Sequence, residues 1–431
     1  MSPTKSSRSK SFQIVRYQYR PTWQRMGLLY LAVWLGTSLV PLRLAEADNR
    51  VLIIGIDGAG GSYLPAVSTP AIDRLAFDGV ASYQSLNEGA LVASPPSGYG
   101  ASGVNWTTIV TGMSAAHHGI VDNSFAGYDP SAAPHFFTAV KQFDPSLFTA
   151  SIVNWSPINQ QLLTNADLAL EYDCCSASAE DAQLTADTMN LLRSGDPHAV
   201  FLHFEQVDAA GHGNGWGGAA YQQAIRNVDA HIGDIVQAVK TRPGYISGEE
   251  NWLIMVTADH GGIGTSHSAG QGHVNWKVPI ILSGSTFPDN SVLVPGTLRD
   301  LAPTALVHLG VAPHTLQLDG GAIGTPGQFL PSGADLNGDH LVNADDFTWF
   351  KNHLDDDLAK LDVTQRYAAG DLNNDGLHSP ADFALFSQQY QYAWANFRGK
   401  VAPPFRAEEI PEPSAFMMLG FAFLVFLRRR R

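Results

Sequence analysis

The sequence predicts an α/β fold in which a mostly parallel central sheet carries helices on both faces. Apolar runs of strand length occur at residues 51–56, 199–204, 252–256 and 278–282. Runs without polar interruption are typical of strands buried on both faces of a parallel sheet. Between them lie segments with helical periodicity, for example residues 221–240. Alternation of strands with helices favours a parallel sheet covered on both sides.

Acidic residues follow three of these predicted strands. Asp57 comes directly after the first run, Asp208 shortly after the second, and Asp259 just after the third. Ligands of open α/β sheets bind at the carboxyl ends of the strands, so we expect the three side chains to converge. A single aspartate in such a place is usually a helix cap, but three of them indicate one shared site.

Histidines accompany two of these aspartates. His212 lies four residues after Asp208, and His260 directly follows Asp259. A mixture of carboxylates and neutral imidazoles is typical of hydrolytic zinc sites and also suits manganese or iron. The sequence therefore predicts a metal-binding site at the ends of these strands.

Five motifs connect these residues to a known family. They are VLIIGIDG at 51–58, TPAIDRLA at 69–76, NWTTIVTG at 105–112 followed by HGI at 118–120, DAAGH at 208–212, and TADHGG at 257–262. In this order they resemble the alkaline phosphatase superfamily over roughly residues 49–310, with the type I phosphodiesterase and nucleotide pyrophosphatase branch as the nearest. The resemblance implies an alkaline phosphatase-like fold and hydrolysis of phosphate esters through a phosphoserine intermediate between two metals.

The resemblance also implies a role for each matching residue. The first metal would be held by Asp57, Ser102, Asp259 and His260, and the second by Asp208, His212 and a third histidine. Ser102 matches the nucleophile because it lies nine residues before Thr111, although Ser94 and Ser97 share its loop. Asn105 matches the asparagine that holds the transferring phosphoryl oxygens. We expect His267 as the third histidine, with His273 as the alternative.

Two departures from the family patterns bear on the substrate. Many diesterases have threonine where this chain has Ser102, so this residue does not separate monoesters from diesters. A sulfatase requires proline two residues and arginine four residues after its nucleophile. Val104 and Trp106 stand there, which argues against a sulfatase.

A repeated acidic loop predicts a second, small domain after about residue 333. The first copy offers loop positions Asp335, Asn337, Asp339, Leu341, Asn343 and Asp346, and the second offers Asp371, Asn373, Asp375, Leu377, Ser379 and Asp382. This spacing is that of an EF-hand-like calcium loop. The pair resembles a type I dockerin, which implies docking to a cohesin-type partner. His340 replaces the usual glycine of the first loop, so we expect weaker binding there.

Both ends of the chain indicate export. A basic region, an apolar run from Met26 and the sequence Ala45-Glu46-Ala47 resemble a signal peptide, with an uncleaved anchor as the alternative. The tail from Pro411 resembles a PEP-CTERM sorting signal that anchors a protein to the membrane transiently. We therefore expect an extracellular, cell-surface or periplasmic protein. Its adjacent cysteines, Cys174 and Cys175, have poor geometry for a mutual disulfide.

The predicted organisation is a signal peptide (1–47), a hydrolase domain (48–330), a dockerin-like domain (331–396), a linker (397–410) and a sorting tail (411–431). A formal net charge of −14 disfavours nucleic acid as a partner. The prediction is an exported metal-dependent phosphodiesterase or phosphatase that acts on a small phosphate ester. The alternatives are a catalytically reduced surface scaffold and another superfamily enzyme such as a phosphonate hydrolase.

Overall fold

The computed structural model describes most of the predicted hydrolase domain and part of the C-terminal repeats. The described residues are 47–92, 95–172, 176–267, 272–288, 290–312, 317–324, 329–331, 344–353, 358, 361, 369–371, 378, 382–383 and 386. The predicted signal peptide, the sorting tail and both cysteines therefore lie outside the described residues. Within the described part of the chain, no helix is long and apolar enough to cross a membrane.

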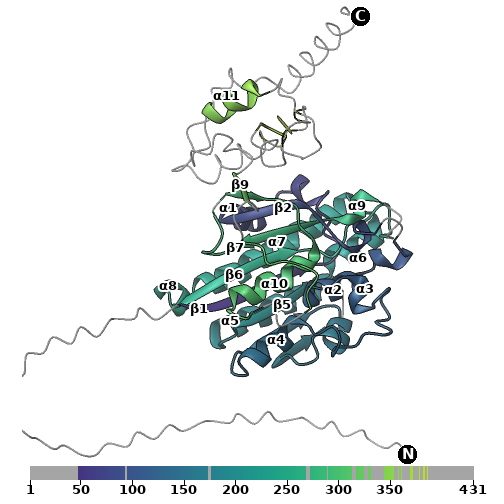
Figure 1. Ribbon diagram of the computed structural model, residues 1–431, viewed down its shortest axis with the longest axis vertical. Coiled ribbons are helices and arrows are strands. Elements are labelled where there is room, and N and C mark those ends of the chain that lie inside the picture. Colours follow the sequence, from purple (N-terminus) through teal and green to yellow (C-terminus); the bar gives the residue numbers. More distant parts are fainter. Residues whose placement is uncertain are drawn as a thin grey trace, which may run out of the picture. The chain divides into compact units, whose positions relative to one another are not determined.

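A mixed sheet forms the centre of the fold (Figure 1). Its strands are β1 (Asp48–Ile56), β2 (Gly79–Leu86), β3 (Thr149–Val153), β4 (Leu168–Glu171), β5 (Ala199–Phe204), β6 (Glu250–Thr257), β7 (Lys277–Ser283), β8 (Ser291–Leu293) and β9 (Phe329–Pro331). In the described residues the strand order is β4-β3-β5-β1-β6-β7-β2-β8-β9. The five strands from β4 to β6 are parallel, while β7 and β9 run antiparallel to their neighbours. The prediction of a mostly parallel sheet is confirmed.

Helices connect and cover the strands, and one further helix, α11, belongs to the predicted C-terminal repeats. They are α1 (Pro70–Phe77), α2 (Ser102–Thr111), α3 (Ala115–His118), α4 (Phe136–Phe143), α5 (Ala177–Ser194), α6 (Gln206–Asn214), α7 (Ala219–Lys240), α8 (Pro243–Ser247), α9 (His273–Trp276), α10 (Leu301–His308) and α11 (Ala344–Asn352). The helix predicted at residues 221–240 is confirmed as α7, and all four predicted strands are confirmed.

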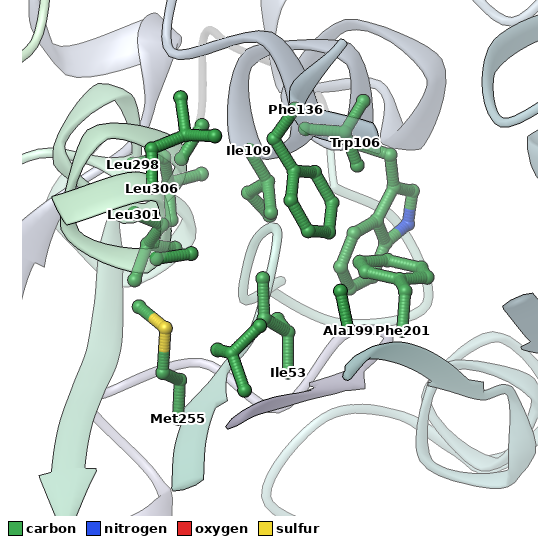
Figure 2. Close-up of a cluster of buried hydrophobic side chains, with 14 of the residues drawn as sticks. Ile53, Trp106, Ile109, Phe136, Ala199, Phe201, Met255, Leu298, Leu301 and Leu306 are labelled. Carbon is green, nitrogen blue, oxygen red and sulfur yellow. The ribbon is translucent and has the colours of Figure 1, made fainter. Parts of the chain in front are cut away.

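Two apolar cores lie on the two faces of the sheet, because successive residues of a strand point to opposite sides. Ile53 of β1 joins the core under α2, α4 and α10, whereas its neighbour Leu52 joins the core under α1, α5 and α7. Figure 2 shows part of the first core, where Trp106 and Phe136 face Phe201 and the other strand residues. Burial on both faces explains the long apolar runs in the central strands.

A side chain of α7 caps the first turn of α1 on one face of the sheet. Thr69, the residue before α1, makes no capping hydrogen bond to that helix. Instead the carboxylate of Asp229 on α7 accepts hydrogen bonds from the backbone N–H groups of Ala71 and Ile72, at 3.1 and 2.8 Å. A side chain from a distant helix thus supplies the cap that the local sequence lacks.

We predict that Asp229→Ala lowers the free energy of unfolding by about 1–2 kcal/mol, the usual cost of a lost helix cap. Asp229→Asn retains an acceptor oxygen and should lose less. Asp234→Ala, an exposed position on the same helix, is the matched control and should change stability by at most about 0.5 kcal/mol. Urea unfolding curves measure all three, and equal losses for Asp229→Ala and Asp234→Ala would contradict the capping role.

Candidate active site

Three predicted carboxylates meet at the carboxyl edge of the sheet. Asp57 follows β1, Asp208 lies on α6 after β5, and Asp259 follows β6. Because β5, β1 and β6 are neighbours in the sheet, their ends bring the three side chains together. All three are buried, with at most 7% of the residue exposed. The expected convergence is confirmed.

His260 lies in the middle of these carboxylates. Its Nε2 atom is 3.4 Å from Asp57 Oδ1, 3.3 Å from Asp259 Oδ2 and 3.9 Å from Asp208 Oδ1. Asp57, Asp259 and His260 each offer one metal-ligating atom within 4.8 Å of the others. This cluster contains the three residues other than Ser102 that were expected to hold the first metal.

A second cluster lies beside the first. It consists of Asp208, His212 and His267, whose ligating atoms again lie within 4.8 Å of one another. Asp208 and His212 are one turn apart on α6, with Oδ2 and Nε2 at 3.4 Å. The His267 ring stacks on the His260 ring with centroids 3.7 Å apart. The structure thus brings His267 into the site, whereas the side chain of its alternative, His273, lies outside the described residues.

The three imidazoles of these clusters share one hydrogen-bonding pattern. Nδ1 contacts a backbone carbonyl in His260 (Gly261, 2.8 Å), in His212 (Thr265, 3.0 Å) and in His267 (Gly100, 2.9 Å). A carbonyl only accepts, so Nδ1 of each ring must carry a proton and donate it. Nε2 of each neutral ring then keeps the lone pair that a metal needs.

The carboxylates leave matching oxygens without hydrogen bonds. Asp57 Oδ1, Asp208 Oδ1 and Asp259 Oδ2 are buried and have no hydrogen-bond partner. A buried acceptor without a partner costs free energy, and a charged one costs more. Three such oxygens beside three lone-pair nitrogens fit divalent cations well.

The electrostatics agree with this fit. Burial and the charge of Asp57 raise the pKa of Asp208 to about 9, and the same two effects raise the pKa of Asp259. Burial also lowers the pKa of His260 to about 3, with a further contribution from His267. The protein alone therefore disfavours negative charge on Asp208 and Asp259 and keeps the His260 imidazole neutral. At Asp57, by contrast, burial is outweighed by hydrogen bonding and charge from His203 and His260, which lower the pKa of that carboxyl. Bound cations would favour the ionised carboxylates, and they need a neutral imidazole as a ligand.

Ser102 is the first residue of α2, and its hydroxyl points toward His260 of the first cluster. Its Oγ lies 3.2 Å from His260 Nε2, and only 6% of the residue is exposed. The N-terminus of a helix stabilises negative charge through its dipole and its backbone N–H groups. The rival Ser94 lies outside the described residues, as does the side chain of Ser97.

Asn105 lies one turn along the same helix with its side chain bonded to backbone groups. Its Oδ1 accepts from Glu88 N at 3.1 Å, and its Nδ2 donates to the carbonyls of Tyr99 and Ala101 at 3.3 and 3.2 Å. This arrangement holds the turn that precedes Ser102. Contact of Asn105 with a phosphoryl oxygen stays a prediction.

Two residues outside the predicted site contact Asp57. Nε2 of His203 and Nε1 of Trp106 lie 3.0 and 3.1 Å from Asp57 Oδ2. His203, Glu205 and Asp57 form a third group of metal-capable side chains. A histidine inside the otherwise apolar strand β5 was the one available signal, because a fully buried imidazole needs a partner.

Sequence comparisons relate two parts of the chain to known families. The family model of type I phosphodiesterase / nucleotide pyrophosphatase matches residues 51–158, and that of the metalloenzyme superfamily matches residues 163–313. These matches confirm the predicted resemblance to the two families over most of residues 51–313. A PEP-CTERM protein-sorting motif matches residues 409–431, which confirms the expected tail.

Curated superfamily relatives match part of the chain. The bis(5'-adenosyl)-triphosphatase ENPP4 of Bos taurus is 25% identical over 236 residues, covering 50% of this chain and 48% of the relative. A 2,3-bisphosphoglycerate-independent phosphoglycerate mutase of Rhodopseudomonas palustris is 33% identical over 123 residues, covering 27% of this chain and 21% of the relative. The chain thus spans about half or less of the length of these relatives.

Among solved structures, a 2-O GAG sulfatase has a TM-score of 0.50 and 14% sequence identity. The match covers 64% of this chain and 73% of the sulfatase. At this identity the likeness shows the fold alone, and the α/β fold class is confirmed.

We predict that His267→Ala removes one of two bound zinc ions, because it takes a lone-pair nitrogen from the second cluster. His273→Ala, the matched control, should keep both. Chelator-treated protein is reloaded with zinc, desalted and analysed by atomic emission. Loss of zinc from His273→Ala together with full retention by His267→Ala would make His273 the ligand instead.

Proposed function

We propose that this chain is an exported, metal-dependent hydrolase of phosphate esters. One observation carries the proposal: the Ser102 hydroxyl lies 3.2 Å from His260 Nε2, at a helix N-terminus and beside carboxylate oxygens that lack partners. A nucleophile, neutral imidazoles and unpaired carboxylates together suit displacement at phosphorus. The matched type I phosphodiesterase family supports the same reaction class.

Two divalent cations would occupy the two clusters. Asp57, Asp259 and His260 would hold one with Ser102, and Asp208, His212 and His267 would hold the other. Zinc is the first candidate, with manganese or iron as alternatives. When bound, such ions lower the pKa of a serine hydroxyl and neutralise charge on the phosphoryl and leaving oxygens.

The protein's own groups would then carry out a two-step displacement. The Ser102 hydroxyl gives up its proton to solvent, its Oγ attacks phosphorus, the new P–O bond gives a phosphoserine, and the bond to the leaving oxygen breaks. Water then attacks the phosphoserine, releasing phosphate or a phosphomonoester and restoring the hydroxyl. Throughout, the N-terminus of α2 stabilises the negative charge beside Ser102. Asn105 keeps the preceding turn in place through its hydrogen bonds to backbone groups.

The substrate class is a small phosphodiester, pyrophosphate or phosphomonoester. One relative is named a bis(5'-adenosyl)-triphosphatase, which favours a nucleotide pyrophosphate among these. A sulfate ester is disfavoured because Val104 and Trp106 replace the proline and arginine of the sulfatase pattern. A catalytically reduced scaffold is disfavoured because the ligand positions of both clusters carry side chains able to bind metal.

We predict that Ser102→Ala lowers turnover of bis(4-nitrophenyl) phosphate and 4-nitrophenyl phosphate by at least about 10³-fold, since no nucleophile remains. Zinc content should match that of the unmodified chain. Ser146→Ala, an exposed serine in another loop, is the control and should keep full turnover. Full activity of Ser102→Ala would remove this residue from the mechanism.

The same assay separates the alternatives. It adds a sulfate ester and a phosphonate ester, each with Zn²⁺, Mn²⁺ or Ca²⁺ supplied in turn. Turnover of the phosphonate alone would identify the chain as a phosphonate hydrolase. Zinc binding without turnover of any ester would favour the scaffold.

We also propose that the C-terminal repeats bind calcium and dock to a cohesin-type partner. Asp346 and Asp382, the last positions of the two loops, are fully buried, and Asp371 is 1% exposed. Phe350 of α11 lies near Phe386 of the second repeat, with ring centroids 5.5 Å apart. Pairing of corresponding aromatics supports a two-loop unit. The other predicted loop positions lie outside the described residues.

We predict that chelation exposes this region to protease, because calcium offsets the charge of its loops. In calcium, Asp346→Ala should be cut faster than the unmodified chain. Asp345→Ala, the exposed neighbouring carboxylate, should be cut at the unmodified rate. Limited proteolysis with and without EGTA measures this, and cleavage independent of calcium would contradict the proposal.

A further inference from the structure

The two carboxylate oxygens of Asp57 have different surroundings. Oδ2 lies 3.1 Å from the indole N–H of Trp106 and 3.0 Å from Nε2 of His203. Oδ1 has no hydrogen-bond partner and faces His260 Nε2 at 3.4 Å. The protein therefore holds one oxygen and leaves the other for a cation.

The tautomer of His203 sets it apart from the three imidazoles that would bind metal. Its Nδ1 lies 3.4 Å from the backbone N–H of Trp155, which only donates, so Nδ1 accepts. The proton of the neutral ring is then on Nε2, where it points at Asp57 Oδ2. A protonated Nε2 has no lone pair for a metal. His203 thus acts as a hydrogen-bond donor, although Asp57, His203 and Glu205 lie close enough to share an ion.

Trp106 reaches Asp57 by passing Gly55 of β1, which has no side chain. A Cβ atom on Gly55 would lie 2.5 Å from the Trp106 ring, so only glycine at that position admits the indole. The ring is fully buried and packs edge-on against His203 and Phe201, with centroids 4.9 and 6.0 Å away. A buried indole N–H needs an acceptor, and Asp57 provides it.

We propose that Trp106 and His203 are positioning residues that fix Asp57 so that Oδ1 alone faces the first metal. The inference rests on the proposed function, because it assumes that Asp57 binds a cation. Both donors act on the cluster of Asp57, Asp259 and His260. Neither contacts Asp208, His212 or His267 through any hydrogen bond within the described residues. Their loss should therefore weaken one metal site and spare the other.

Calorimetric titration of the chelator-treated full chain with zinc tests whether one metal site weakens while the other is spared. Trp106→Phe and His203→Leu each remove a donor, and the first-cluster dissociation constant should rise by about tenfold or more, as for other outer-shell partners of metal ligands. His203→Gln keeps an N–H donor and should recover most of the loss. The second-cluster affinity should stay unchanged in all three.

Phe201→Leu is the matched control, because Phe201 packs against Trp106 in the same core but donates no hydrogen bond. It should lower the thermal midpoint of the metal-free protein and leave both zinc affinities unchanged. Unmodified first-cluster affinity in Trp106→Phe and His203→Leu would overturn the inference. So would equal weakening of both clusters, because that indicates general damage. If the unmodified chain binds no zinc, the proposed function itself fails.

Discussion

The burial of three carboxylates at one edge of the sheet is the constraint on which the rest of this site depends. Neighbouring parallel strands place Asp57, Asp208 and Asp259 together and away from water, where ionisation of all three would bring like charges close to one another. The surrounding structure satisfies one oxygen of Asp57 and one oxygen of Asp259. Asp259 Oδ1 accepts the backbone N–H groups of Gly58 and His260, at 3.1 and 2.9 Å, while its Oδ2 has no hydrogen-bond partner. Asp57 shows the same division between its two oxygens.

Close packing around Gly58 supports the carboxylates. Gly58 adopts a positive φ of 71°, and a Cβ there would lie 3.0 Å from Asp208, so the chain turns closely beneath the site. Its carbonyl accepts hydrogen bonds from Trp216 and Tyr221, at 3.1 and 2.8 Å. Aromatic side chains with one polar atom thus fill the space between the sheet and α7 while leaving few backbone groups unpaired. Rigid surroundings of this kind keep metal ligands in place before a metal binds.

Helix α2 connects the proposed nucleophile, Ser102, to the proposed metal site. Ser102 stands at its first position and Trp106 lies one turn later, so one rigid element carries both the attacking hydroxyl and a donor to Asp57. Asn105 anchors the same turn to the backbone of the preceding loop. A displacement of this helix would therefore change the nucleophile and the metal site together.

The sequence by itself determined the fold class, the four main strands and the aspartates at their ends. Apolar runs report burial on both faces, and the carboxyl ends of parallel strands share one edge. The family resemblance favoured His267 over His273, but only the tertiary structure placed His267 beside Asp208 and His212, because it comes from a loop with no periodic signal. Only the structure separated His203 from the histidines that we propose as metal ligands as well. Residue type and spacing do not encode which ring nitrogen carries the proton, since a backbone group distant in sequence decides it.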